Sequence, residues 1–442
     1  MTIGLQRRAQ NRSRTAALDP AQRELPAWPV LVLLWGMPAW WALGMLPFIA
    51  IIVSVPMIAF LSQRSRVKLV PGMLPFVAFV VWMLPCALML DSFGRMVGFS
   101  MRFTQFAAVA VALVYVVNAR HALTVRRVMS GLTFTWVFVI AGGYLGMIWP
   151  ETTLTMTIGQ LLPASILENE YVHDLVFPSF AEVQTPWGAA EPFERPSAPF
   201  PYTNGWGAAI AILTPIAVAT ALERRTAAAT VWLMLGIAAA IPPAIATTNR
   251  GLFVGLIAAV GYVLLRLLAR GKWVPFLWVG SLGTILVVLL TLTGALNGIA
   301  ERQDAADTSE GRGSLYEETF VRALASPILG YGAPRPSFTS EITVGTQGMI
   351  WDAMFCFGFV GLALFALFML GGLARTWSAP NVSALWLHSS IVSACALSIF
   401  YGLDRHILTI CLVLGVMLRE HYAPSSRFWN ANPRTEVSTH AA

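Results

Sequence analysis

The sequence GRGSLYEETFVRALASPILGYGAPRP (residues 311–336) lies between long apolar stretches and has the spacing of an amphipathic helix. Phe320, Leu324 and Ile328 recur every fourth residue, and charged residues lie between them. The helical pattern ends in the breakers of SPILGYG. The stretch therefore predicts an amphipathic element on a membrane surface, which the rest of the chain holds over a site in the bilayer.

The composition of the whole chain is that of a membrane protein. Hydrophobic residues make up 57% of the 442 residues, charged residues only 12%, and the mean hydropathy is +0.67. These values exclude an ordinary soluble enzyme and are typical of a polytopic membrane protein. The partner that composition implies is the lipid bilayer, and no nucleic acid is implied. The four cysteines lie in apolar stretches without metal-like spacing and are interpreted as small buried residues.

Apolar windows of about 20 residues, long enough to cross a bilayer, recur along the chain. They lie at 28–45, 46–62, 71–90, 101–118, 128–149, 204–222, 228–246, 251–269, 273–293, 347–371, 382–401 and 406–419. The sequence therefore predicts an all-α integral membrane protein with about 12 transmembrane helices. Residues 27–419 would form a single polytopic membrane domain, with tails at 1–26 and 420–442.

The charged residues predict which side of the membrane each loop occupies. Twenty of the 29 Lys and Arg residues, but only five of the 22 acidic ones, fall on the side of the N-terminus in this topology. Because positive charge accumulates in cytoplasmic loops, both termini are predicted to be cytoplasmic. The two large loops, about 150–203 and 294–346, are then extracytoplasmic. The predicted location is a bacterial cytoplasmic (inner) membrane, crossed many times.

The basic residues on the predicted outer face are all arginines. A planar guanidinium binds phosphate with two hydrogen bonds, which suits a diphosphate at a membrane surface, but each arginine could equally pair with an outer carboxylate. Arg250, in ATTNRGLFVG, is the strongest candidate because an ionisable group at the membrane edge is costly unless it faces a polar cavity. Arg102 and Arg95, in DSFGRMVGFSMR, are predicted to lie less deep. The alternative interpretation is that the side chains of Arg250 and Arg102 extend (snorkel) to the lipid headgroups.

The run PFERPSAPFPYTNGWG (192–207) closes the first large loop and enters the sixth window. Its prolines hold the backbone extended, and a helix starts at Asn204 and Gly205. Free backbone N–H groups at this helix start could bind an anion, or the segment is a capped helix after a structured linker. Glu194 and Arg195 are the charged residues next to this start. The outer candidates for a proton acceptor are His173, Glu191, Glu194, Asp352, Asp404 and His406.

Three segments together resemble the bacterial O-antigen ligase and O-antigen polymerase superfamily. FPYTNGWG is similar to a P-N-x-x-G helix entry, TTNRG to an S-R-G element with Asn249 in place of Ser, and GRGSLYEETFVRALASPILGYG to a G-R-x-x-x-W…P-x-x-G-x-G segment. The resemblance covers about residues 200–365. It implies a GT-C-like membrane glycosyltransferase. The family's His-Asn-x-x-Leu run has Gln347 where the His is expected, and a neutral Gln orients a hydroxyl but cannot take its proton.

The resemblance implies transfer of a glycan from a polyprenyl-diphosphate carrier to a hydroxyl of an acceptor glycan or glycolipid on the outer face. Arg250, Arg102 and Arg312 would hold the diphosphate, and Arg322 and Arg195 would support or gate it. Gln347 would orient the acceptor, and Asp352 or Glu194 would take its proton, unless the leaving diphosphate drives the reaction. No metal or other cofactor is implied, because no Asp, Glu and His cluster has ligand spacing.

Two other classes of function stay open at this stage. One is a transporter or flippase of a lipid-linked or anionic envelope precursor, for which repeat symmetry and charges at mid-helix depth are expected. The other is a non-catalytic member of an envelope-assembly complex, which Gln347 favours. The sugar, the acceptor, the choice between ligase and polymerase, and the oligomeric state are not determined by the sequence.

Overall fold

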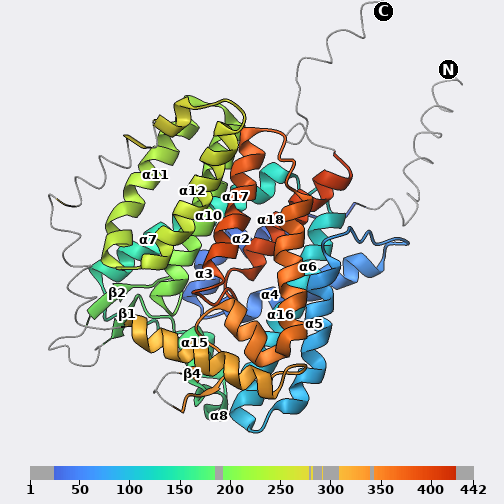
Figure 1. Cartoon of the computed structure of the whole chain (residues 1–442), viewed down its shortest axis with the longest axis vertical. Helices are drawn as coiled ribbons and strands as arrows, with labels where there is room; N and C mark the ends of the chain where they lie inside the picture. The colour runs from blue at the N-terminus through green and yellow to red at the C-terminus, as the bar shows by residue number, and fades with distance from the viewer. Residues whose placement is uncertain are drawn as a thin grey trace, which may run out of the picture.

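The computed structural model describes residues 24–184, 193–277, 308–338 and 343–424, together with residues 280, 281 and 291. The chain is mostly helical, and the long helices run side by side (Figure 1). The prediction of a mainly helical chain is confirmed. The predicted tails at 1–26 and 420–442 lie mainly outside the described residues.

Helices of the first half of the chain alternate with short turns. Their bounds are α2 (Trp28–Trp35), α3 (Met37–Ala42), α4 (Leu46–Ser62), α5 (Leu74–Cys86), the 3-10 turn η2 (Ala87–Met89), α6 (Phe93–Asn118) and α7 (Val125–Ile148). The segment between the fifth and sixth predicted windows holds the 3-10 turn η3 (Ile158–Leu161), α8 (Ala164–Leu167) and α9 (Glu170–Val176). The first predicted window, 28–45, is two helices, because the chain turns at Gly36 between α2 and α3.

The second half of the chain contains the remaining long helices. Their bounds are α10 (Thr203–Arg224), α11 (Ala227–Ala246), α12 (Arg250–Leu268), α15 (Thr308–Ala325), α16 (Met349–Arg375), α17 (Val382–Leu397) and α18 (Ile407–Tyr422). Side chains cap several of these starts: Thr226 caps α11, Asn249 caps α12 and Asn381 caps α17, each accepting from a backbone N–H in the first turn. Most of the ninth predicted window, 273–293, lies outside the described residues.

Two small antiparallel sheets lie in the predicted outer loops. Strand β1 (Ala181–Gln184) pairs with β2 (Phe193–Pro196), and β3 (Arg335–Pro336) pairs with β4 (Thr343–Val344). Between β2 and α10 the chain makes its proline-rich turn. Helix α15 crosses the ends of the long helices obliquely in Figure 1. These elements together cover one end of the helix bundle.

Six of the described helices are long and apolar enough to cross a membrane: α6, α7, α10, α11, α12 and α16. Three shorter apolar segments, Leu46–Ser62, Leu74–Met89 and Val382–Leu397, accompany them. Apart from the split first window and the incompletely described ninth, each predicted window has a helix. The count of twelve spans stays a prediction.

Helix α6 begins two turns earlier than its apolar window. The Ser92 side chain accepts from the backbone N–H of Arg95 and caps the helix, so that α6 starts at Phe93 rather than near residue 101. Arg102 therefore follows the helix start by nine residues, about 13 Å along the axis. The depth of Arg102 in the membrane stays a prediction.

Helix α16 is interrupted at Gly358, which has φ 69° and ψ −178°. The interruption frees carbonyl groups of the preceding turn, and the SPILGYG segment uses two of them. The backbone N–H of Tyr331 donates to Phe355 O at 2.9 Å, and that of Gly332 donates to Cys356 O at 2.8 Å. The turn after α15 is thereby attached to the broken part of α16.

Two further hydrogen bonds complete the pairing at this break. The N–H of Phe359 donates to Pro327 O at 2.8 Å, and the indole N–H of Trp82 donates to Phe357 O at 3.0 Å. Irregular backbone at membrane depth is tolerated where protein groups take up the freed hydrogen bonds. The break in α16 meets this condition with partners from the 327–332 turn and from α5.

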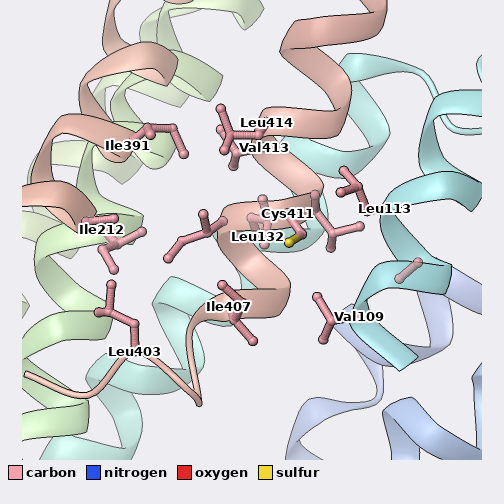
Figure 2. Close-up of a cluster of buried hydrophobic side chains, with 14 of the residues drawn as sticks. Val109, Leu113, Leu132, Ile212, Ile391, Leu403, Ile407, Cys411, Val413 and Leu414 are labelled. Carbon is pink, nitrogen blue, oxygen red and sulfur yellow. The ribbon is translucent and has the colours of Figure 1, made fainter. Parts of the chain in front are cut away.

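The buried core lies where α6, α7, α10, α17 and α18 meet, and Figure 2 shows side chains from these helices in one cluster. Helix α10 is central, because 78% of its apolar window is buried, whereas only 6% of that of α11 is. α11 therefore lies at the edge of the bundle with most of its apolar surface uncovered.

The two ends of the described chain lie at the same end of the bundle. The Tyr115 hydroxyl, near the end of α6, donates to Pro26 O at 2.6 Å. Just beyond α6, the Arg120 guanidinium donates to Ala423 O. We call this end of the bundle the terminal end. The opposite end, where α6 starts and where α15 and the small sheets lie, is called the cavity end.

Candidate functional site

A cavity of about 620 Å³ opens at the cavity end of the bundle. Its walls come from the first turns of α6, α9, the start of α10, the 332–334 turn, the β4 loop, the start of α16 and the loop 400–406. Small-molecule sites have volumes of this order and carry a few placed polar groups in an apolar wall. This cavity is the candidate site.

Arg102 joins two aspartates in the floor of the cavity. Its Nη1 lies 2.7 Å from Asp352 Oδ1, and its Nη2 lies 3.6 Å from Asp404 Oδ2. All three side chains are largely covered, with exposed fractions of 14%, 6% and 15%. The three residues come from α6, α16 and the loop before α18, so only the fold brings them together.

Three polar atoms of this cluster have no hydrogen-bond partner among the described residues. They are Asp352 Oδ2, Asp404 Oδ1 and His406 Nε2, and each is buried. Buried polar atoms are nearly always satisfied, so exceptions at a cavity need an explanation. A water molecule, or a ligand group that these side chains turn to meet, would supply the missing partners.

The neighbouring residues extend the polar cluster. Arg405 Nη1 lies 3.5 Å from Gln105 Oε1, and Gln105 Nε2 donates to Pro47 O at 3.1 Å. The His406 ring packs on Phe200 with ring centroids 5.1 Å apart. Arg405 and His406 thus place a charged and a neutral polar group on the cavity wall between aromatic and apolar surfaces.

The start of α10 is occupied by a carboxylate of the protein itself. Glu182 Oε2 accepts from the Thr203 backbone N–H at 2.8 Å. The same oxygen lies 3.9 Å from Arg195 Nη1, and Arg195 Nε donates to Thr247 O at 3.0 Å. The anion expected at this helix start is therefore an internal one, and Arg195 is a buried structural cation rather than part of the cavity lining.

Tyr202, just before α10, lines the cavity beside Glu182. Its hydroxyl donates to Asp174 Oδ2 at 2.8 Å. Burial, followed by the hydrogen bond and negative charge of Asp174, raises the pKa of Tyr202. Tyr202 is therefore a neutral hydroxyl that a ligand meets at this wall.

Gln347 organises its own loop. Its Oε1 accepts from the backbone N–H groups of Gly345 and Thr346, at 3.1 and 3.2 Å, and its Nε2 donates to Thr343 O at 2.7 Å. The amide is thus engaged with the β4 loop, whose residues line the cavity while Gln347 does not. The structure gives Gln347 a loop-shaping position and leaves the predicted contact with an acceptor without support.

Arg250 lies outside the cavity lining. It is the first residue of α12, its side chain is exposed, and it forms no ion pair among the described residues. The buried neighbour Asn249 bonds the Thr203 carbonyl at 3.1 Å and the Tyr401 hydroxyl, which also accepts from Gly251 N. Because Tyr401 lines the cavity, the N-R-G element borders the site through Asn249.

Of the two arginines in α15, the described one, Arg322, lies outside the cavity lining. Arg322 pairs with Glu318 at 2.9 Å and covers the Phe338 ring at 4.4 Å, so its charge stabilises the α15 turn region. Arg312 falls in α15, but its side chain lies outside the described residues.

The remaining proton-acceptor candidates are scattered. Glu194 is exposed on β2, opposite Val183, and does not line the cavity. His173 is half exposed and lies 3.6 Å from Asp174. Glu191 lies outside the described residues. The cavity lining therefore brings together five of the predicted groups: Arg95, Arg102, Asp352, Asp404 and His406. Six other predicted groups that the structure describes lie outside this lining: His173, Glu194, Arg195, Arg250, Arg322 and Gln347.

Sequence reasoning gave no role to Arg405, Tyr401 and Glu182. The signal for Arg405 was its place inside the Asp404–His406 triplet, since charges at the end of an apolar window are costly without a polar cavity. Tyr401 and Glu182 carried no local signal, because their partners lie far away in the chain. Among the described residues, no group of three or more His, Cys, Asp or Glu side chains is placed to hold a metal ion.

No family model matches this chain, and no curated protein matches its sequence. The resemblance to O-antigen ligases and polymerases therefore stays a prediction, which depends on the three sequence segments.

Proposed function

We propose that this chain is an integral membrane glycosyltransferase with a GT-C-like fold, acting on the outer face of a bacterial cytoplasmic membrane. It moves a glycan from a polyprenyl-diphosphate carrier to a hydroxyl of an acceptor glycan or glycolipid. The observation that carries the proposal is the cavity where Arg102 joins Asp352 and Asp404, at the end of the bundle opposite to the chain ends. A site at a membrane surface suits a substrate whose carrier stays in the bilayer.

The cavity provides the groups that such a transfer needs. The acceptor oxygen forms a bond to the anomeric carbon, the bond from that carbon to the diphosphate oxygen breaks, and the acceptor proton moves to a base. Asp404 Oδ1 and Asp352 Oδ2 are carboxylate oxygens with no partner among the described residues, so either can take this proton. Arg102 and Arg405 would stabilise the charge of the leaving diphosphate.

The charges of the cavity restrict how a diphosphate binds. The lining carries three arginines and four carboxylates: Arg95, Arg102, Arg405, Glu170, Glu182, Asp352 and Asp404. A diphosphate adds negative charge, so binding requires Asp404 to leave Arg102 or one carboxylate to be protonated. The Asp404 contact, at 3.6 Å, is the weaker of the two contacts of Arg102. We therefore assign Asp404 as the carboxylate that the donor displaces and that then acts as base.

The experiment is deletion of the gene, followed by profiling of carrier-linked glycans and complementation with variants. Polyprenyl-linked glycan is expected to accumulate in the deletion strain and to return to normal with wild type and with Arg375→Gln, a change at the terminal end. Arg102→Ala and Asp404→Asn are expected to fail. If carrier-linked glycans do not change on deletion, the transferase proposal is wrong.

Arg250→Ala separates the cavity from the family motif as the source of the diphosphate site. If Arg250→Ala fails to complement the deletion strain and Arg102→Ala complements it, the diphosphate site lies at the start of α12. Loss of activity in Arg102→Ala with activity kept in Arg250→Ala supports the cavity assignment. Arg102→Lys is a finer test, since Lys cannot form the two parallel hydrogen bonds that a diphosphate receives from Arg.

A second candidate is transport of a lipid-linked or anionic precursor, and two observations favour it. Arg102 lies in the body of α6 with two aspartates, and α16 is broken at Gly358 close to Asp352. Charged groups and interrupted helices mark substrate pathways in transporters. Purified protein in liposomes decides between the two candidates, because a transporter moves labelled precursor across the bilayer without changing its covalent structure.

A further inference from the structure

A second cavity, of about 700 Å³, opens on the side of the bundle between α7, α10 and α11. It runs along α11 from Thr226 to Ala239. Helix α11 meets α7 closely at Gly236, where an added Cβ would lie 2.5 Å from the Trp136 ring. Most of the apolar surface of α11 remains uncovered, and Trp232 is 72% exposed. We call this cavity the α11 groove.

The polar side chains in the wall of the α11 groove are paired within the protein. Thr133 and Thr220 share a hydrogen bond of 2.8 Å, and Trp136 Nε1 donates to Thr214 Oγ1 at 3.0 Å. The rest of the wall is formed by Ala, Val, Leu, Ile, Phe and Trp side chains. The groove therefore offers apolar surface to its occupant along its length.

The terminal end of the α11 groove is basic. Arg224 lines the groove, is exposed, and lies 3.5 Å from the Ser130 hydroxyl, its only hydrogen-bond partner among the described residues. Arg225 follows in a left-handed conformation, φ 52°, at the turn into α11. The nearest acidic residue in sequence, Glu223, pairs with Arg126 at 3.3 Å. The apolar groove thus ends at Arg224, and neither Arg224 nor the neighbouring Arg225 forms an ion pair with a described carboxylate.

We propose that the α11 groove binds an anionic phospholipid. One acyl chain lies along α11 between α7 and α10, and the phosphate lies against Arg224 and the hydroxyls of Ser130 and Thr226. The helices at the groove are long and apolar enough to cross a membrane, so lipid is the molecule that surrounds them. An anionic headgroup complements the arginine charge, and arginine binds phosphate with two hydrogen bonds.

The other occupant to consider is the chain itself, at residues 282–300, which the structure does not describe apart from residue 291. That stretch is apolar and contains no Asp or Glu. It would fill the groove but leave the arginine charge without a partner. The charge of Arg224 therefore favours the anionic lipid over this segment. The lipid site is independent of the proposed function, because it lies away from the cavity that holds Arg102.

The test uses full-length protein in nanodiscs of phosphatidylcholine alone or of equimolar phosphatidylcholine and phosphatidylglycerol. We expect a higher unfolding temperature with phosphatidylglycerol, and retention of phosphatidylglycerol over phosphatidylcholine in native mass spectrometry. Arg224→Gln should lower this preference about tenfold, the equivalent of losing one hydrogen bond to a charged group. Arg375→Gln, at an exposed arginine in the last turn of α16, is the matched control and should keep the preference.

Ala239→Phe places bulk at the inner end of the groove and should reduce retention of both lipids. Arg224→Gln is a surface change that leaves the packed core intact, so the test does not depend on Ala239→Phe folding. Equal stabilisation of the wild type by the two lipid mixtures would overturn the proposal. This is also the result expected if residues 282–300 fill the groove. A phosphatidylglycerol preference that Arg224→Gln leaves unchanged would overturn the proposal as well, because the lipid would then bind elsewhere.

Discussion

The contact between Arg102 and Asp352 joins residues 250 positions apart, and both side chains are almost fully covered. Removing two charges from water costs several kcal/mol for each ion, and this cost is recovered only when the geometry and the additional hydrogen bonds are good. Arg102 meets this requirement with two aspartates, while each aspartate keeps one oxygen without a described partner. Such a cluster is poorly explained as a stabilising device alone, which is why we assign it to a substrate.

Asp352→Asn is expected to destabilise the protein strongly. The change removes the negative charge that pairs with Arg102 at 2.7 Å and leaves the buried guanidinium without this partner. The expected fall in the free energy of unfolding is about 3 to 5 kcal/mol. The measurement is the thermal unfolding midpoint of the purified protein in detergent. Arg126→Gln is the control, because it breaks the exposed pair with Glu223 and should cost at most about 1 kcal/mol. If the two changes lower the unfolding midpoint equally, the Arg102–Asp352 pair contributes no more to stability than the exposed pair.

At the scale of elements, the broken helix α16 connects the sequence segment SPILGYG to the cavity. The first part of α16 carries Asp352, and its last carbonyls accept from the turn that follows α15. Gly330 and Gly332 both have positive φ, and an added Cβ at Gly330 would lie 2.5 Å from Phe355 O. The glycines of this segment are thus explained by the close approach of two backbones. Because the turn is bonded to the part of α16 that carries Asp352, a change in the turn is expected to shift the position of Asp352.

Gly358→Ala tests this arrangement. An Ala would hold a positive φ at a cost of about 1 to 3 kcal/mol, and its Cβ would lie 2.1 Å from Ile328 O. We expect a marked fall in the unfolding temperature and loss of complementation in the deletion strain. Gly371→Ala, in the regular part of the same helix, meets only the flexible end of Arg375 and should be neutral or slightly stabilising. A neutral Gly358→Ala would mean that α16 can run through without its break.

At the scale of the whole molecule, the two ends of the bundle differ in chemistry. The cavity, the small sheets and α15 lie at one end, and the ends of the described chain lie at the other. This arrangement agrees with the charge distribution in the sequence, which predicts that the arginine-rich terminal end is cytoplasmic. The side of the membrane that each end faces follows from charge alone and is open to direct measurement.

Cysteine labelling tests the orientation. Ser165→Cys, exposed on α8 at the cavity end, and Ser65→Cys, exposed after α4 at the terminal end, make a pair of near-isosteric changes. The native cysteines are covered to a large extent, so background labelling is low. A membrane-impermeant maleimide should label Ser165→Cys in intact spheroplasts, and Ser65→Cys only after the membrane is opened. The reverse pattern would invert the predicted topology.

The sequence by itself determined the helical class, the places of most helices and the proline-rich entry to α10. The window 46–62 coincides with α4, because apolar length and breakers are local properties that the chain carries wherever it folds. It also singled out Asp352, Asp404 and His406 as groups at apolar edges. It missed the early start of α6, since the cap at Ser92 outweighed the apolar pattern.

Only the tertiary structure decided which of these residues meet. Arg102 forms ion pairs with Asp352 and Asp404 across the bundle. The amide of Gln347 hydrogen-bonds within its own loop, and Arg250 lies outside the cavity lining. Contacts between side chains hundreds of residues apart depend on how the helices pack, and the local sequence pattern does not predict that packing. The helix predicted in the stretch 311–336 is confirmed as α15, but Phe320, Leu324 and Ile328, the residues of its predicted apolar face, are exposed. The link of this stretch to the cavity depends on the break in α16, which binds the turn after α15.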